Sequence, residues 1–410
     1  MTPSDREAAK RSWRDVASVF LKLGATAYGG PAIMGIMQAE LQEKRHWLSR
    51  ERFVEGLSLV NMLPGAGATQ LAIFLGYARG GWWGGLLAGL CFVLPAFFVL
   101  LALTVGYAAY GTAPLVRGAL YGLGPVVMGI FLVALYRLGR SAAATPPQFM
   151  IAAAAAAASA LAPFGIAATL ALSGGVGLLL FHSRKLGAIA LGFVAALIVL
   201  VHLGPWLVPA LSPTPAPAGV PLHSPGLVDV GAFFFMVGAF SFGGGLTMIA
   251  FIQEQVVSHY HWLTPREFID GLALGQFTPG PILMVSAYVG YKVAGISGAV
   301  VSAAGIFSPS FILMLSVLPV FERVRRLAWT RAALKGIGPA VIGVLGVALL
   351  QMAPHALPDS LAAVVFIGTV TAMLAWRVHA IMLMAGGALV GVLNSRLRSI
   401  AALRTTVWPA

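Results

Sequence analysis

The stretch LGATAYGGPAIM, residues 23–34, decides the fold, because VGAFSFGGGLTMI, residues 237–249, repeats it in the other half of the chain. At a displacement of 214 residues, Gly24 aligns with Gly238 and Tyr28 with Phe242. An ordered series of matches of this kind identifies an internal duplication. Further matches follow at the same displacement or one residue more: Asp15 with Asp229, Trp47-Leu48 with Trp262-Leu263, Glu55-Gly56 with Asp270-Gly271, Pro64-Gly65 with Pro279-Gly280, Gly76-Tyr77 with Gly290-Tyr291, Pro95 with Pro309, Arg117 with Arg331, and Gly122-x-Gly124-Pro125 with Gly336-x-Gly338-Pro339.

The composition places both copies in a membrane. Of the 410 residues, 59% are hydrophobic and only 10% are charged, against about 25% charged in soluble domains. Lys and Arg are scattered at the ends of apolar runs, which marks them as topology signals and argues against nucleic-acid binding. The fold class is an all-α polytopic membrane protein. About thirteen transmembrane helices are predicted, near residues 16–39, 53–78, 83–110, 117–137, 146–161, 163–181, 186–211, 227–253, 267–293, 296–320, 332–352, 358–376 and 378–394.

Six spans in each copy and one span between them would give the two repeats opposite orientations in the bilayer. The predicted domains are a cytoplasmic N-terminal segment at 1–15, a first repeat at 16–185, a linking span with a proline-rich linker at 186–226, a second, inverted repeat at 227–395 and a C-terminal tail at 396–410. No cleaved signal peptide is recognisable. We therefore expect a multi-pass protein of the prokaryotic plasma (inner) membrane with its N-terminus in the cytoplasm.

Four helix interruptions fall at equivalent places in the two copies. Gly29-Gly30-Pro31 interrupts the first span, and Gly243-Gly244-Gly245 interrupts its partner. Pro64-Gly65 interrupts the second span, and Thr278-Pro279-Gly280-Pro281 interrupts its partner. Glycine and proline break helices, and the restarted half-helix presents free amides that suit an anion. Inverted repeats with interrupted helices are the architecture of secondary transporters, so we expect an oxyanion site at these breaks.

Polar side chains flank the breaks and are the predicted substrate ligands. Asn61 and Gln276 are equivalent residues, each three positions before the proline, and Gln70 and Thr278 lie on the other side of a break or within it. Amide side chains can donate hydrogen bonds to a dehydrated oxyanion, but they also hold membrane helices together. Both roles stay open for Asn61 and Gln276.

Four cations are candidates for attracting or holding an anion. Lys22 and Lys335 lie in or near predicted spans, where a charge is costly enough to indicate function, although either could extend its amine to the membrane surface. Arg117 and Arg331 are equivalent and precede the Gly-x-Gly-Pro runs. They either guide anions into the path or anchor the topology.

Two equivalent carboxylates, Glu55 and Asp270, begin the second span of each repeat. They are the candidates for proton coupling. The alternative is an ion pair with Arg52 or Arg266 at the interface.

No catalytic, cofactor or metal motif is recognisable. The sequence has no HExxH, no GxSxG and no GxxxxGK[ST], so we expect neither an enzyme nor a bound cofactor or metal. An anion channel stays open as an alternative to a carrier, because the same half-helix geometry can line a pore.

Several segments carry a resemblance to a known family. They are LGATAYGGPAIM (23–34), KRHWLSRERFVEGL (44–57) and NMLPGAGATQLAIFLGY (61–77) in the first half, and HWLTPREFIDGLALGQFTPGPI (261–282) and VGYKVAG (289–295) in the second. On these motifs the chain resembles the chromate ion transporters in their long, two-domain form. The resemblance implies a carrier that exports chromate using the proton motive force, with sulfate as a structural analogue. The oligomeric state stays open, with a homodimer as one form.

Three residues depart from the family pattern in the first half. Ala66 stands where the family has a second proline, Ile33 where a histidine is common, and Tyr28 where phenylalanine is usual. These changes alter the first-half break and leave a carrier for another small oxyanion as an alternative.

Overall fold

The computed structural model describes residues 3–28, 32–161, 165–207, 225–241, 246–320 and 328–407. Within these ranges the chain is helical and contains no strand. Five helical stretches are long and apolar enough to cross a membrane: Gly67–Tyr110, Pro114–Arg140, Ile282–Val317, Ala332–Ala356 and Ala380–Leu397. Shorter apolar helices lie at Pro146–Leu161, Gly165–Phe181, Leu227–Ala239 and Ser360–Ala375.

The helices of the second half repeat those of the first in order. The first half contains α1 (Pro3–Thr26), α2 (Ala32–Met37) with a π-helical continuation at Gln38–Lys44, α3 (Arg50–Met62), α4 (Gly67–Tyr110), α5 (Pro114–Ala142), α6 (Pro146–Leu161) and α7 (Gly165–Phe181). Their counterparts are α9 (Leu227–Ala239), α10 (Leu246–Gln253) with a π-helical continuation at Glu254–His259, α11 (Pro265–Phe277), α12 (Val285–Val317), α14 (Ala328–Ala356), α15 (Ser360–Ala375) and α16 (Ala380–Val407). Only α8 (Arg184–Leu207) has no counterpart among the described helices.

Both long helices reverse direction at a glycine. In α4 the turn lies at Gly80-Gly81, where Gly81 has φ +64°, and in α12 it lies at Ala294-Gly295, where Gly295 has the same φ. Glycine suits this left-handed conformation because it has no Cβ. The two turns separate the predicted spans 53–78 from 83–110 and 267–293 from 296–320.

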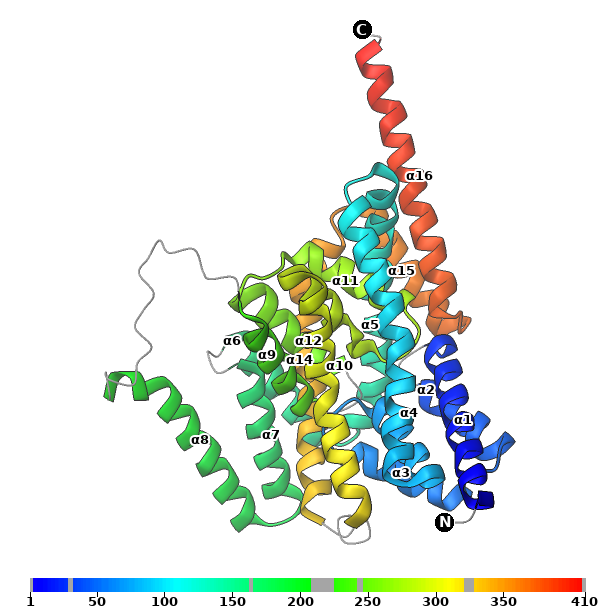
Figure 1. The fold of residues 1–410 in the computed structure, drawn as a ribbon. Helices are drawn as coiled ribbons and strands as arrows, with labels where there is room; N and C mark the ends of the chain where they lie inside the picture. Colours follow the sequence, from blue (N-terminus) through cyan, green and yellow to red (C-terminus); the bar gives the residue numbers. More distant parts are fainter. Residues whose placement is uncertain are drawn as a thin grey trace.

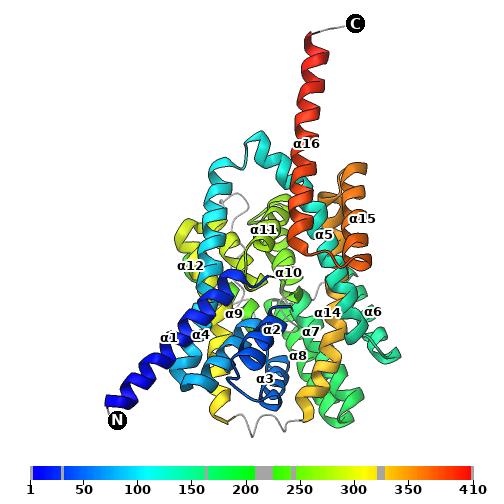
Figure 2. The same ribbon diagram turned by 90° about the vertical axis from the view of Figure 1, so that its right-hand side faces the viewer.

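The longer arms of these two hairpins, residues 82–110 and 296–317, run in opposite directions through the centre of the molecule. In Figures 1 and 2 the arm of α4 rises from the end near the N-terminus, whereas the arm of α12 descends towards that end. The arms are equivalent in sequence, and α4 packs against α12. The core of the molecule therefore pairs one repeat with the other.

Glycine allows the first helix of each repeat to touch the long arm of the same repeat. A Cβ built on Gly24 of α1 would lie 2.4 Å from the carbonyl oxygen of Phe92, and one built on Gly238 of α9 would lie 2.1 Å from that of Ile306. Gly24 and Gly238 are equivalent, as are Phe92 and Ile306. The duplicated glycines thus produce the same close backbone contact twice.

Gly24→Ala is expected to lower the thermal unfolding midpoint, because the added methyl group must displace backbone. Overpacking of this kind costs about 1–3 kcal/mol. Thermal unfolding of detergent-purified protein measures the change. Gly35→Ala is the matched control, since nothing lies within 4 Å of a Cβ at Gly35 in α2; equal midpoints for the two variants would contradict the close contact.

The last helices of each repeat pack on the other repeat. Helix α5 packs along α15 and α16, and its counterpart α14 packs along α6 and α7. Glycines line these contacts, since a Cβ on Gly122 would lie 1.9 Å from the carbonyl oxygen of Gly387 and one on Gly336 would lie 2.0 Å from that of Ser173. The two halves therefore exchange their terminal helices.

The linking helix α8 packs on α7 and stands away from the body of the protein in Figure 1. Its outer face is apolar and at least half exposed at Ile189, Phe193, Leu197 and Leu200. The proline-rich linker, predicted within 186–226, lies largely outside the described residues. The predicted span 378–394 is longer in the structure, since α16 extends over Ala380–Val407.

Candidate functional site

The two Pro-Gly breaks have the same local cause. Leu63 precedes Pro64 and Thr278 precedes Pro279, and both adopt extended conformations, with ψ of 143° and 127°. The residue before a proline disfavours the helical region, so α3 and α11 end there. The following glycines take left-handed conformations, with φ of +134° at Gly65 and +97° at Gly280.

Each break is hydrogen-bonded to the other half of the chain. The Gly65 amide donates to the carbonyl oxygen of Ser241 at 2.5 Å, and the Gly280 amide donates to that of Ala27 at 2.8 Å. Gly65 and Gly280 are equivalent, and so are Ala27 and Ser241. A reciprocal pair of this kind is the contact that a two-fold relation between the halves produces.

A second reciprocal contact surrounds the first. A Cβ on Gly65 would lie 2.6 Å from Ser310 Oγ, and a Cβ on Gly280 would lie 2.8 Å from the Cβ of Ala96. The Ala66 amide also donates to Ser310 Oγ at 2.7 Å. Ser310 and Ala96 are equivalent, each following the proline inside a long arm. We call the region formed by these two sets of contacts the crossing; it consists of Ala27, Pro64–Ala66, Ala96, Ser241, Pro279–Pro281 and Ser310.

Polar side chains at and beside the crossing are buried without full hydrogen bonding. Gln70 Nε2 donates to the Pro64 carbonyl oxygen at 2.6 Å, but Gln70 Oε1 has no hydrogen-bond partner among the described residues. The same holds for Thr69 Oγ1 and Ser241 Oγ, and all three residues are fully buried. A buried polar atom without a partner costs about 1–3 kcal/mol. Such atoms beside a helix break are candidates for contact with a small polar ligand.

The restarted helix α4 points its N-terminus at the same place. Its cap residue is Ala66, whose side chain cannot cap the helix. The amides of the first turn and the positive end of the helix dipole therefore favour negative charge beside Gly65.

Several predicted site residues lie at or next to the crossing. Pro64, Gly65 and Gln70 come from the first half, and Pro279, Gly280 and Pro281 from the second. Thr278 is buried, but its hydroxyl donates to the Leu274 carbonyl oxygen of its own helix at 3.0 Å. Gln276 is half-buried near the end of α11. Six predicted residues lie outside the described part of the chain, as does the side chain of Asn61: they are Gly29, Gly30, Pro31, Gly243, Gly244 and Gly245.

The two predicted lysines are exposed. Lys22 lies on the outside of α1, and Lys335 Nζ lies 5.5 Å from the ring centroid of Phe181. Neither lysine makes a hydrogen bond or ion pair with a described residue of the crossing. The side chain of Arg331 lies outside the described part of the structure. Its equivalent in the first half, Arg117, lines two cavities.

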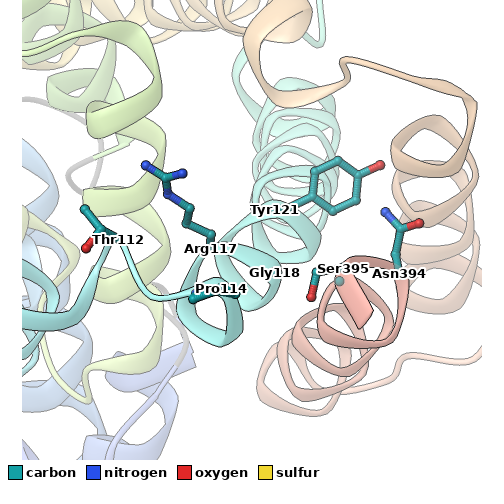
Figure 3. A pocket seen from close by; sticks show the side chains of 8 residues that line it. Thr112, Pro114, Arg117, Gly118, Tyr121, Asn394 and Ser395 are labelled. Carbon is teal, nitrogen blue, oxygen red and sulfur yellow. The ribbon is translucent and has the colours of Figure 1, made fainter. Parts of the chain in front are cut away.

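A charged cavity lies at the N-terminal end of α11. Its volume is about 500 Å³, and it is lined by residues of both halves: Tyr107, Ala108, Gly111, Thr112, Arg117, Leu120, Arg266, Glu267, Asp270 and Lys292. A second cavity of about 310 Å³ shares Thr112 and Arg117. Figure 3 shows that Arg117 extends towards the side of Thr112, whereas Tyr121 extends towards Asn394. Arg117 thus stands between the two cavities.

The two candidate proton-coupling carboxylates have different surroundings. Asp270 has 8% of its side chain exposed, lies 3.4 Å from Arg266 Nε and accepts a hydrogen bond of 3.1 Å from the Tyr107 hydroxyl of the other half. Glu55 is 34% exposed and pairs with Arg52 of its own helix at 3.0 Å. Both carboxylates form the ion pairs considered from the sequence. The hydrogen bond from Tyr107 also connects Asp270 to the other repeat.

Sequence reasoning did not single out Tyr107 and Lys292 as site residues. Lys292 Nζ lies 2.7 Å from Glu267 Oε1 and 5.9 Å from the Tyr107 ring centroid. The repeat alignment contains a signal for Lys292, because the equivalent residue of the first half is Ala78. A cation in one repeat with alanine at the equivalent position makes the two halves chemically different there.

Comparison with known proteins agrees with the duplicated geometry. The sequence profile described as "Chromate transporter" matches residues 14–181 and 228–392, one segment in each half. The chain belongs to the chromate transporter family. This confirms the resemblance seen in the motifs, and together with the apolar helices it makes the chain a multi-pass membrane protein.

Curated members of the chromate transporter family align with almost the whole chain. The chromate transport protein of Cupriavidus metallidurans is 32% identical over 383 residues, which cover 92% of each chain. The probable chromate transport protein of Synechococcus elongatus is 31% identical over 85% of this chain and 86% of its own length. The chromate transport protein of Pseudomonas aeruginosa is 29% identical over 83% of this chain and 81% of its own. No solved structure matches the chain.

Proposed function

We propose that this member of the chromate transporter family is a secondary transporter that exports chromate, or a related tetrahedral oxyanion such as sulfate, across the plasma membrane. Family membership and the names of the curated relatives support chromate as the substrate. The observation that carries the proposal is the crossing, where each broken helix is hydrogen-bonded to the other half of the chain. This is the arrangement in which a transporter holds a small ion between its repeats.

The repeats are inverted in this proposal, with thirteen spans in all. Support comes from the opposite directions of residues 82–110 and 296–317, and from α3 and α11, which lie at different heights in both views (Figures 1 and 2). Inversion gives two pseudo-symmetric arrangements of the repeats. Exchange between them would open the crossing first to one side of the membrane and then to the other.

The oxyanion lies beside the N-terminus of α4 in this proposal. The uncapped first turn supplies amide donors, and the buried hydroxyls of Thr69 and Ser241 supply two more. Gln276 and Asn61 stay proposed ligands, as do the glycines 29–30 and 243–245. Hydrogen bonds from neutral donors bind a dianion without placing a fixed cation in the membrane interior, where such a charge is costly.

Asp270 is the proposed proton-coupling group. It is buried, faces a cavity and contacts both repeats, so a change in its charge acts on the interface that must rearrange. Glu55 is the weaker candidate because its side chain is more exposed.

Flux into proteoliposomes tests the proposal. Purified protein is expected to mediate saturable uptake of radiolabelled chromate, which an imposed proton gradient accelerates and sulfate competes. Uptake that does not saturate and ignores the gradient would indicate an anion channel. If demonstrably folded protein gave no chromate flux, the protein would carry a different substrate, in keeping with its departures from the family pattern at Ala66 and Ile33.

A further inference from the structure

The charged cavity and the crossing lie at the two ends of α11. Arg266 and Asp270 belong to the first two turns of this helix, and Thr278 caps its other end. Twelve residues separate Arg266 from Thr278, which is about 18 Å along a helix that rises 1.5 Å per residue. The cavity is therefore a separate place from the oxyanion site proposed above.

Three cationic side chains and two carboxylates line the cavity, so one positive charge has no carboxylate to balance it. Lys292 pairs with Glu267 at 2.7 Å, and Arg266 pairs with Asp270 at 3.4 Å. Arg117 is exposed and makes no ion pair with any carboxylate in the part of the chain that the structure describes. Arg117 lines both cavities, and its guanidinium extends towards the side of Thr112, the other residue that they share (Figure 3).

The backbone around Arg117 adds to the positive potential. Arg117 lies in the first turn of α5, which begins with Pro114 and has no side-chain hydrogen bond at its cap residue Ala113. The positive end of the helix dipole therefore points at the same space. The hydroxyl of Thr112, which lines both cavities, supplies a neutral donor.

We propose that this cavity is a second oxyanion site, in which Arg117 and Thr112 hold a tetrahedral dianion at one end of the path through the crossing. A guanidinium binds two oxygens of such an ion at once, which a lysine amine does not do. The inference takes its class of ligand from the proposed function. The cavity volume of about 500 Å³ leaves room for an ion that still carries part of its water shell.

The two repeats do not provide this site equally. Arg266 and Lys292 have Glu51 and Ala78 as their equivalents in the first half. The first half also has Arg52 in place of Glu267, so its equivalent positions exchange one cation and one carboxylate and lack the cation of Lys292. The second site therefore belongs to one face of the membrane, the face away from the N-terminus (Figure 1). With the expected cytoplasmic N-terminus, this is the face on which an exporter releases its anion.

Protection of a single cysteine tests the site without any need for transport. Cys91 is the only cysteine of the chain, so Cys91→Ala with Ala108→Cys carries one thiol, at an exposed position in the lining of the cavity that the proposal does not use as a ligand. The reaction of this thiol with N-ethylmaleimide, a neutral reagent, is followed in detergent-purified protein with potassium sulfate or with potassium chloride at equal ionic strength. Sulfate is the probe because chromate oxidises thiols. We expect sulfate to slow the reaction at least fivefold and Arg117→Gln to remove this protection.

Two controls show whether the protection is local. Arg140→Gln removes an exposed arginine at the far end of the same helix and should leave protection intact. A cysteine at Thr145, exposed and outside both cavities, should not be protected at all. Absence of protection at Ala108→Cys, or protection that survives Arg117→Gln, overturns the inference. Protection in a protein that carries no chromate would refute the proposed function alone, and chromate flux without protection would refute the second site alone.

Discussion

Gly65→Ala is expected to reduce chromate transport more than a hundredfold while the protein still inserts in the membrane. Alanine disfavours the φ of +134° at this position, and its Cβ would lie 2.4 Å from Gln70 Nε2 and 2.6 Å from Ser310 Oγ. The break would have to move, and with it the hydrogen bond from the Gly65 amide to Ser241. Initial rates of radiolabelled chromate uptake into proteoliposomes measure the effect.

Gly80→Ala is the matched control for this prediction. Gly80 lies in the turn of the same helix, its φ is not positive, and a Cβ there meets nothing within 4 Å. Transport by Gly80→Ala should stay within about a factor of two of the parent, whereas Gly280→Ala should behave like Gly65→Ala because Gly280 occupies the equivalent position. Normal transport by folded Gly65→Ala protein would remove the crossing from the substrate path.

Asp270→Asn is expected to reduce the acceleration of chromate transport by a proton gradient at least tenfold. Asparagine keeps the shape and the hydrogen bond with Tyr107 but cannot gain or lose a proton in this range. The equivalent change Glu55→Gln should alter the gradient effect less than twofold, since the Glu55 side chain is more exposed. Uptake is measured with and without the gradient at one external pH. A gradient effect retained by Asp270→Asn would assign coupling to another group.

The crossing could be predicted from the sequence because its cause is local. Proline at 64 and 279, with glycine next to it, dictates where a helix stops whatever surrounds it. Because the sequence is duplicated, a helix break in one half implies an equivalent break in the other. Which atoms meet across the halves could not be predicted, since the bond from Gly65 to Ser241 depends on the relative placement of two helices far apart in the chain.

The exchange of terminal helices between the two halves could not be predicted from the sequence. Gly122 and Gly387 approach closely because both lack a side chain, but small residues permit close packing without specifying a partner. The difference between Asp270 and Glu55 was equally hidden, because it depends on Tyr107 reaching across from the other repeat. The repeated sequence pattern identifies equivalent residues in the two halves, whereas burial and long-range contacts decide which of two equivalent residues has a functional role.

The exchange of helices between the halves has a consequence for biogenesis. Helix α5 packs on α15 and α16, which follow it by about 220 residues in the chain. At the usual speed of translation its partners are synthesised roughly 10–45 s later. During that interval the glycine-lined face of α5 meets lipid or a neighbouring insertion factor, so a ribosome that stalls beyond the linker leaves a membrane protein whose first half is complete in sequence but unfinished in structure.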